Sequence, residues 1–212
     1  LRCILGLAET VVTGCADGYG RATGRPAATL MHCGPGLANG LSSLHNARRG
    51  FTPIVNVVGD QATYHRPLDA PLTADTEGLA RAVSQWVRTS TRAAHVGADA
   101  AAAVQAARSA PGNIATLVLP ADCAWDEGAA PGAPLAKVER APVSADAVAV
   151  AARALKSGQP AMILLAGAGL SERAVAAAWR ISKASGAMLR APTQVSRLAR
   201  GRGRAPLDRL PY

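Results

Sequence analysis

The sequence predicts an α/β fold built around a mainly parallel sheet. Short apolar runs alternate with stretches in which apolar residues recur at helical spacing, the pattern of strands connected by helices. Aromatic residues make up only 3% of the chain, so Ala, Val, Leu and Gly must form most of the core. Such a composition favours helices lying close on a sheet over an aromatic-rich β-sandwich. The length of 212 residues suits one large or two small domains.

The first unit is expected to alternate strands and helices. The predicted strands are residues 3–7, 27–32, 53–58, 85–88 and 114–119. The predicted helices are residues 10–22, 37–48, a stretch beginning near Thr76, and 97–109. A long polar loop, residues 59–75, separates the third strand from the helix that follows it.

The chain is expected to divide into a domain at 1–128, a linker at 129–142 and a second, partial domain at 143–212. The linker contains the run AAPGAP, which is typical of interdomain segments. In the second domain Ser144 caps a helix, residues 161–166 form a buried strand, and Ser171 caps a helix that ends near Gly186. This βα unit predicts an incomplete Rossmann-like domain.

Glu9 is the first candidate for chemistry. It follows the apolar run of residues 1–7 and begins a stretch of small and apolar residues, so it lies at a predicted strand-to-helix junction. Ligands of open α/β sheets collect at the carboxyl ends of strands, which makes a carboxylate there a candidate site residue. The alternative is a solvated first-turn glutamate favoured by the helix dipole.

A family resemblance favours the first interpretation. Glu9 is followed by Ala16-Asp17-Gly18-Tyr19 and Arg21, and then by a strand, Gly34-Pro35-Gly36 and Asn39. In this order and spacing the residues resemble the pyrimidine-binding domain of thiamine-diphosphate enzymes, and the acetolactate synthase large subunits in particular. The likeness covers residues 1–128, and a weaker one to the family's central domain covers 143–212.

The resemblance implies a cofactor, thiamine diphosphate, and a 2-oxo acid substrate. It implies that Glu9 is the catalytic carboxylate that bonds to the cofactor's pyrimidine ring nitrogen, and that Gly34, Pro35, Gly36 and Asn39 approach the cofactor. Tight strand–helix packing explains the glycines equally well. Magnesium would be held by a diphosphate-binding domain that is absent from this chain, so no metal ligand is assigned here; FAD in the central domain is possible within the family.

Three further residues are candidates for the substrate pocket. His32 replaces the threonine that is usual in acetolactate synthases and resembles a pocket histidine of benzoylformate decarboxylases. Gln61 resembles a glutamine that follows the third strand in acetolactate synthases, although Asp60 intervenes. His65 lies in the following loop, where related decarboxylases place polar residues that face the substrate.

Charge and cysteine content argue against other classes of protein. The net charge of +9 comes entirely from residues 140–212, whose arginine-rich tail lacks the interleaved aromatic residues that stack on bases, so no nucleic-acid partner is expected. The four cysteines are widely spaced, predict no zinc site, and are expected to pack in the core. A Cys33–His32 catalytic pair is not expected, because neighbours on a strand point to opposite faces.

The resemblance implies an acetolactate synthase-like carboligase or decarboxylase. Three alternative functions stay open: a benzoylformate decarboxylase-like lyase, a dinucleotide-binding oxidoreductase and a non-enzymatic interaction module. The oxidoreductase is suggested by Gly34-x-Gly36 after a strand, but Asn39 stands where a third glycine is needed. No apolar run reaches the length of about 20 residues that a membrane span needs, and a cytoplasmic protein is the default. We expect a fragment of a homodimeric or homotetrameric enzyme that is inactive alone.

Overall fold

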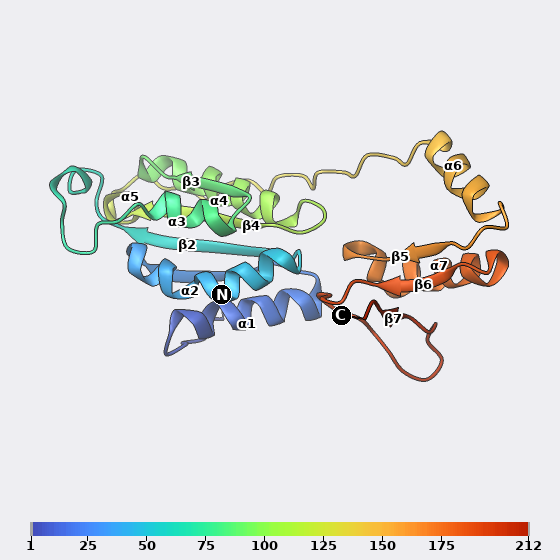
Figure 1. The fold of residues 1–212 in the computed structure, drawn as a ribbon. Coiled ribbons are helices and arrows are strands. Elements are labelled where there is room, and N and C mark those ends of the chain that lie inside the picture. Colours follow the sequence, from blue (N-terminus) through green and yellow to red (C-terminus); the bar gives the residue numbers. More distant parts are fainter. Residues whose placement is uncertain (1, 212) are drawn as a thin grey trace. The chain divides into compact units, whose positions relative to one another are not determined.

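The computed structural model describes residues 2–211, which form two compact units divided between Glu139 and Arg140. The first unit contains a four-stranded, wholly parallel sheet in the order β1-β2-β4-β3 (Figure 1). Its strands are β1 (Ala27–His32), β2 (Ile54–Asp60), β3 (Trp86–Thr89) and β4 (Ile114–Pro120). Its helices are α1 (Glu9–Thr23), α2 (Cys33–Arg49), η1 (Arg66–Leu68), α3 (Thr76–Val83), α4 (Ala93–Arg108) and α5 (Ala121–Trp125).

Alternate residues of the central strands face opposite layers of helices. Ile54 and Val58 of β2 belong to a core shared with α1, α2 and α3, whereas Val55 packs with Ala103 and Ala107 of α4. Because successive side chains of a strand point to opposite faces, the sheet has helices on both sides. The α/β prediction with a parallel sheet is confirmed.

The carboxyl ends of the parallel strands bring several polar residues to one edge. In the register of the sheet His32 pairs with Gly59, and Asp60 pairs with Pro120. Asp60 is the last residue of β2 and pairs without a bulge, so it belongs to the regular strand. The loop of residues 61–75 follows β2 at this edge of the sheet (Figure 1).

The prediction of a strand at residues 3–7 is wrong. Residues 2–6 have no regular secondary structure, and Ile4, Leu5 and Leu7 are largely exposed. A strand requires a hydrogen-bonded neighbour, and β1 is paired only with β2 among the described strands. Leu1, the first residue of this apolar run, lies outside the described residues.

Helix α2 begins at Cys33, before the expected start at residue 37, so Gly34-Pro35-Gly36 is its first turn and not a loop. The first four N–H groups of a helix have no intrahelical acceptor, and Pro35, which lacks an N–H, is therefore tolerated there. Cys33 adopts a left-handed φ of 54° between the strand and the helix.

The second unit contains a three-stranded parallel sheet in the order β5-β6-β7. Its elements are α6 (Ala145–Leu155), β5 (Met162–Leu164), η2 (Gly167–Leu170), α7 (Glu172–Ser185), β6 (Met188–Ala191) and β7 (Asp208–Arg209). Ser144 and Ser171 cap their helices as predicted, and Gly186 ends α7 with a φ of 75°.

One expectation about burial in this unit is wrong. Strand β5 is short, and its Met162 and Leu164 are about half exposed, although a buried strand was expected. Helix α6 buries none of its residues. The core of the unit instead lies between η2, α7 and β6, with Leu170, Val175 and Leu189 among its members.

The arginine-rich tail is folded back onto its own unit. The Arg200 guanidinium donates to the Leu207 carbonyl oxygen at 3.1 Å, and Arg204 pairs with Glu172. Arg209 donates to the Thr193 carbonyl oxygen at 3.3 Å. No helix in residues 2–211 is long and apolar enough to cross a membrane.

Candidate active site

The Glu9 carboxylate lies against the first turns of α2. Glu9 is the first residue of α1 and is half-buried. Asn39 Nδ2 donates to Glu9 Oε2 at 3.3 Å, and a methyl group at Gly36 would lie 3.3 Å from Glu9 Oε1. The positive end of the α2 dipole favours a negative charge at this position. The structure therefore brings together Glu9, Gly36 and Asn39.

Contacts from three hydroxyl groups hold α1 close to α2. The Thr10 hydroxyl donates to the Asn39 carbonyl oxygen at 2.5 Å, and the Thr13 hydroxyl lies 3.2 Å from the Gly40 carbonyl oxygen. From the other side, the Ser43 hydroxyl donates to the Thr10 carbonyl oxygen at 3.1 Å. Such close approach requires glycine at residue 40, where a Cβ would lie 2.9 Å from Thr13 Cγ2.

These positioning residues were missed in the sequence. Thr10, Thr13 and Ser43 are ordinary helix residues by composition, and no motif singles them out. A signal did exist, because Gly36 and Gly40 are separated by one helical turn and present a side-chain-free stripe to a neighbouring helix.

The glycines of the first turn of α2 have different roles. A Cβ at Gly34 would lie 2.4 Å from Ala74 Cβ, so Gly34 allows the loop of residues 61–75 to pack on α2. Gly36 instead faces the Glu9 carboxylate, while the Pro35 side chain is exposed. Tight packing thus accounts for Gly34, whereas a side chain at Gly36 would crowd the Glu9 carboxylate.

The candidate pocket residues lie at the same edge of the sheet but make different contacts. His32, the exposed last residue of β1, adjoins the Gly36 backbone, where a Cβ would lie 3.8 Å from His32 Cβ. Gln61 donates to the Pro71 carbonyl oxygen at 2.7 Å. His65 is exposed, and its ring lies edge-on to the Tyr64 ring with 4.5 Å between the ring centroids. The side-chain contacts recorded for Gln61 and His65 therefore lie within their own loop.

Arg66 ties this loop to the sheet. Its Nε lies 3.5 Å from Asp60 Oδ2, and its Nη2 lies 3.5 Å from Glu77 Oε1. Glu77 also accepts a hydrogen bond from the Thr89 hydroxyl at 2.6 Å. Asp60 is buried, and its charge is compensated by Arg66 and by the amide of Gln61, which donates to Oδ1 at 2.9 Å.

Cys33 is not poised as a nucleophile. Its sulfur lies 3.9 Å from both ring nitrogens of His32, and equal distances do not fit a hydrogen bond directed at either nitrogen. Burial, and then the charge of Asp60, raise the pKa of the Cys33 thiol. The reason given above for excluding the pair was wrong, because Cys33 begins a helix and does not lie on the strand.

All four cysteines were expected to pack in the core, and two of them do. Cys33 and Cys123 are buried, whereas Cys3 and Cys15 are exposed. Cys3 lies in the N-terminal segment that forms no strand, and Cys15 is on the exposed side of α1. Within residues 2–211, no group of three His, Cys, Asp or Glu side chains is placed to hold a metal ion.

Comparison with known proteins identifies the family. Residues 1–87 match the model of the N-terminal cofactor-binding domain of thiamine pyrophosphate enzymes. The whole chain is 50% identical over 214 residues to the acetolactate synthase large-subunit-like protein IlvX of Mycobacterium tuberculosis, and it covers 41% of that relative. The chain belongs to the thiamine-diphosphate-dependent enzyme family.

Other relatives agree with this assignment. Benzoylformate decarboxylase of Pseudomonas aeruginosa is 34% identical over 122 residues, which are 57% of this chain and 23% of that enzyme. The structure of a thiamine-diphosphate-dependent enzyme of Mycobacterium smegmatis superimposes with a TM-score of 0.82 at 27% identity, over 91% of this chain and 37% of that one. This family member thus spans less than half the length of the relatives it matches.

Part of the motif that carries the resemblance is structural in this family member. Asp17 Oδ1 accepts hydrogen bonds from Arg21 Nε at 2.8 Å and from the Thr52 hydroxyl at 2.7 Å. The Thr52 bond fastens α1 to the segment that enters β2, while the Arg21 bond lies within α1. Asn39, which stands where a dinucleotide motif has its third glycine, donates a hydrogen bond to Glu9.

Proposed function

We propose that this chain forms the pyrimidine-binding side of an active site that acts on 2-oxo acids, with acetolactate synthase-like carboligation as its reaction. The observation that carries the proposal is the half-buried Glu9 carboxylate, held by Asn39 beside the side-chain-free backbone of Gly36. The family relatives support the class of reaction, since they include acetolactate synthase-like proteins and a benzoylformate decarboxylase.

The residues around Glu9 fit a flat heterocycle such as the cofactor's pyrimidine. Glu9 Oε2 is occupied by Asn39, while Oε1 has no recorded hydrogen-bond partner within residues 2–211. A Cβ at Gly36 would fill the space next to Oε1, so glycine keeps that side of the carboxylate open. Asn39 orients Glu9, and Gly34-Pro35-Gly36 and Asn39 provide the surface that a ring would approach.

When bound, thiamine diphosphate supplies the carbon nucleophile and the electron sink that decarboxylation requires. Glu9 would hold a proton at Oε1, shared with the pyrimidine ring nitrogen, and so act as a general acid–base. Thr10, Thr13 and Ser43 keep the carboxylate in place by fastening α1 to α2. His32 would contribute an imidazole at the carboxyl end of β1, and Gln61 and His65 would line the substrate side from the adjacent loop.

The decisive variant is Glu9→Gln in the complete product of the gene that encodes this chain, assayed with thiamine diphosphate, magnesium and pyruvate. The amide is nearly isosteric but cannot relay a proton, so cofactor affinity should stay within a few fold while turnover falls about a hundredfold or more. Near-normal turnover would refute the role of Glu9. Loss of cofactor affinity with no change in turnover at saturation would make Glu9 a binding residue only.

A benzoylformate decarboxylase-like lyase is the second candidate, and His32 favours it. An imidazole beside Gly36 can exchange a proton with a substrate, which the threonine usual in acetolactate synthases does less readily. Product analysis separates the two candidates. Acetolactate formed from pyruvate supports the first, and benzaldehyde formed from benzoylformate, lost in His32→Ala, supports the second.

For the 212 residues alone we expect no measurable decarboxylation of 2-oxo acids, even with saturating cofactor and magnesium. The family resemblance assigns the metal-bridged diphosphate to another domain, and this chain matches the N-terminal portion. Carbon dioxide release that Glu9→Gln abolishes would contradict this.

For the gene product we propose a homodimer or homotetramer in the cytoplasm, which light scattering and cell fractionation would test. The resemblance also allows FAD in the central domain, and the visible absorption spectrum of the purified gene product would test its presence.

A further inference from the structure

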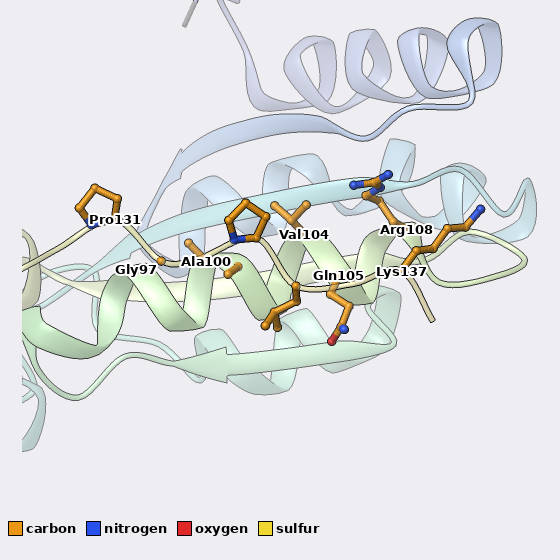
Figure 2. Close-up of a pocket in the computed structure, with 11 residues that line it drawn as sticks. Gly97, Ala100, Val104, Gln105, Arg108, Pro131 and Lys137 are labelled. Atoms are coloured by element: carbon orange, nitrogen blue, oxygen red, sulfur yellow. The ribbon is translucent and has the colours of Figure 1, made fainter. Parts of the chain in front are cut away.

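A pocket of about 380 Å³ lies on the outer face of α4, away from the Glu9 site. One stripe of the helix forms its floor, with Gly97, Ala101, Val104 and Arg108 one turn apart in succession. Figure 2 labels Gly97, Val104 and Arg108 along this stripe. Residues 131–137, which follow the first sheet in sequence, cross over this stripe and form the opposite wall. We call residues 130–137 the strap.

The strap is fixed to α4 at both ends. At one end the backbone of the strap lies directly against the backbone of α4. A Cβ at Gly97 would lie 2.0 Å from the Ala130 carbonyl oxygen, and a Cβ at Gly132 would lie 2.0 Å from the Gly97 carbonyl oxygen. At the other end Gln105 Nε2 donates to the Ala136 carbonyl oxygen at 2.7 Å. Gly97 and Gly132 therefore permit a contact that no other residue would allow.

The lengths of the two walls show that the strap is extended. Gly97 and Gln105 are roughly 12 Å apart along a helix that rises 1.5 Å per residue. The four residue steps from Gly132 to Ala136 span only about 13 Å when the chain is fully extended. The strap therefore runs nearly straight between its anchors, and part of the sequence expected as a free linker at 129–142 is held against the first unit.

The lining of the pocket is divided by polarity. Between the anchors it is apolar, with Ala100, Ala101 and Val104 facing Pro134 and Leu135. At the far end lie Arg108 and Lys137, which Figure 2 shows on the opposite side from Gly97 and Pro131. Neither Arg108 nor Lys137 has a recorded ion pair with any described carboxylate.

We propose that this pocket binds a small amphipathic carboxylate, whose apolar chain lies under the strap and whose anionic end pairs with Arg108 and Lys137. The volume is within the range of small-molecule sites, about 300–1,000 Å³. An apolar channel with two cations at one end matches a molecule that is apolar along its length and anionic at its tip. A neutral or cationic molecule of the same length leaves both cations without a counter-charge.

Calorimetric titration of the purified chain with sodium octanoate tests the proposal, with octanol and octylamine as length-matched probes. We expect saturable binding of octanoate at one site per chain, weaker binding of octanol, and none of octylamine. In ¹⁵N-labelled protein the amide signals of Gly97 and Gly132 should shift with the same saturation. Equal binding of octanoate and octylamine, or no binding of octanoate, would overturn the proposal.

Variants distinguish this pocket from adventitious binding. Arg108→Gln and Lys137→Gln should each weaken octanoate binding about threefold to fivefold, as expected for partly exposed ion pairs, whereas Arg92→Gln, an exposed charge at the other end of α4, should leave it unchanged. Ala101→Phe should fill the pocket and abolish binding. If Ala101→Phe does not fold, Val104→Asp at a partly exposed position supplies the same test by repelling the carboxylate. Identical affinities in Arg92→Gln, Arg108→Gln and Lys137→Gln would refute the site.

Discussion

Asn39 on α2 donates a hydrogen bond to the carboxylate of Glu9 on α1, with 3.3 Å between Nδ2 and Oε2. The two residues are far apart in sequence and meet because Gly36 and Gly40 allow the helices to approach closely. The other carboxylate oxygen is left beside the Gly36 backbone. The orientation of Glu9 thus depends on small residues of a different helix.

Gly36→Ala should impair function without loss of stability. Alanine stabilises a helix by up to about 1 kcal/mol relative to glycine, so the free energy of unfolding should not fall. The new Cβ would lie 3.3 Å from Glu9 Oε1 and would displace the carboxylate by a few tenths of an ångström. We expect turnover of the gene product to fall roughly tenfold, because catalysis is sensitive to such displacements.

Gly18→Ala is the matched control for this variant. Gly18 lies within α1, and a Cβ there would meet no atom within 4 Å. It should raise the free energy of unfolding by about 0.5–1 kcal/mol and leave turnover unchanged. Equal turnover in the two variants would show that the space beside Glu9 is not used.

Arg66→Gln should loosen the loop of residues 61–75. The change removes the cation that faces the buried Asp60 and also pairs with Glu77, at a cost of about 1–3 kcal/mol for an unsatisfied buried charge. Chemical denaturation would measure this loss, and limited proteolysis should cut within the loop. Arg81→Gln, which removes only an exposed partner of Glu77, should cost less than about 0.5 kcal/mol. Equal costs would show that burial of Asp60 is irrelevant.

Much of the secondary structure of both units could be predicted from local pattern. The strand at 27–32 and the caps at Ser144, Ser171 and Gly186 follow from apolar runs and from residues with specific backbone preferences. The apolar run at 3–7 was predicted wrongly by the same reasoning, because a strand also depends on a neighbour that local sequence does not report. The predicted burial of the strand at 161–166 was wrong for a similar reason, since Met162 and Leu164 of β5 are about half exposed.

The candidate site was only partly accessible to sequence reasoning. Glu9 was a candidate from its position in the sequence, and Gly36 and Asn39 came from the family resemblance. The structure brings the three residues together, while their roles stay predictions. The hydroxyl groups of Thr10 and Ser43 that fasten the two helices were not found, because their partners are backbone carbonyls on another helix. The strap over α4 was likewise hidden, because a proline- and glycine-rich run looks like a free linker.

The four cysteines should differ in their reactivity. Desolvation by burial raises the pKa of both Cys33 and Cys123, and nearby carboxylates add to the effect, so both thiols stay protonated at neutral pH. The thiolate is the reactive species. Iodoacetamide at pH 7.5 followed by peptide mass spectrometry should therefore label the exposed Cys3 and Cys15 first. Labelling of Cys33 before Cys15 would indicate an activated thiol beside His32.

The pH dependence of stability should include a contribution from Asp122. Desolvation acts to raise the pKa of this carboxyl, but hydrogen bonds from the Thr63 hydroxyl and amide, at 2.5 and 3.0 Å, and from nearby backbone amides lower it below its ordinary value. A pKa lowered in the folded state contributes stability above the unfolded pKa of about 3.9, and that contribution is lost as the pH falls through the folded pKa.

Thr63→Val removes one donor, so the Asp122 pKa, followed by ¹³C NMR, should rise towards its ordinary value. The stability difference between the two proteins should be largest at neutral pH and shrink in acid; a difference that grows as the pH falls would contradict the assigned sign.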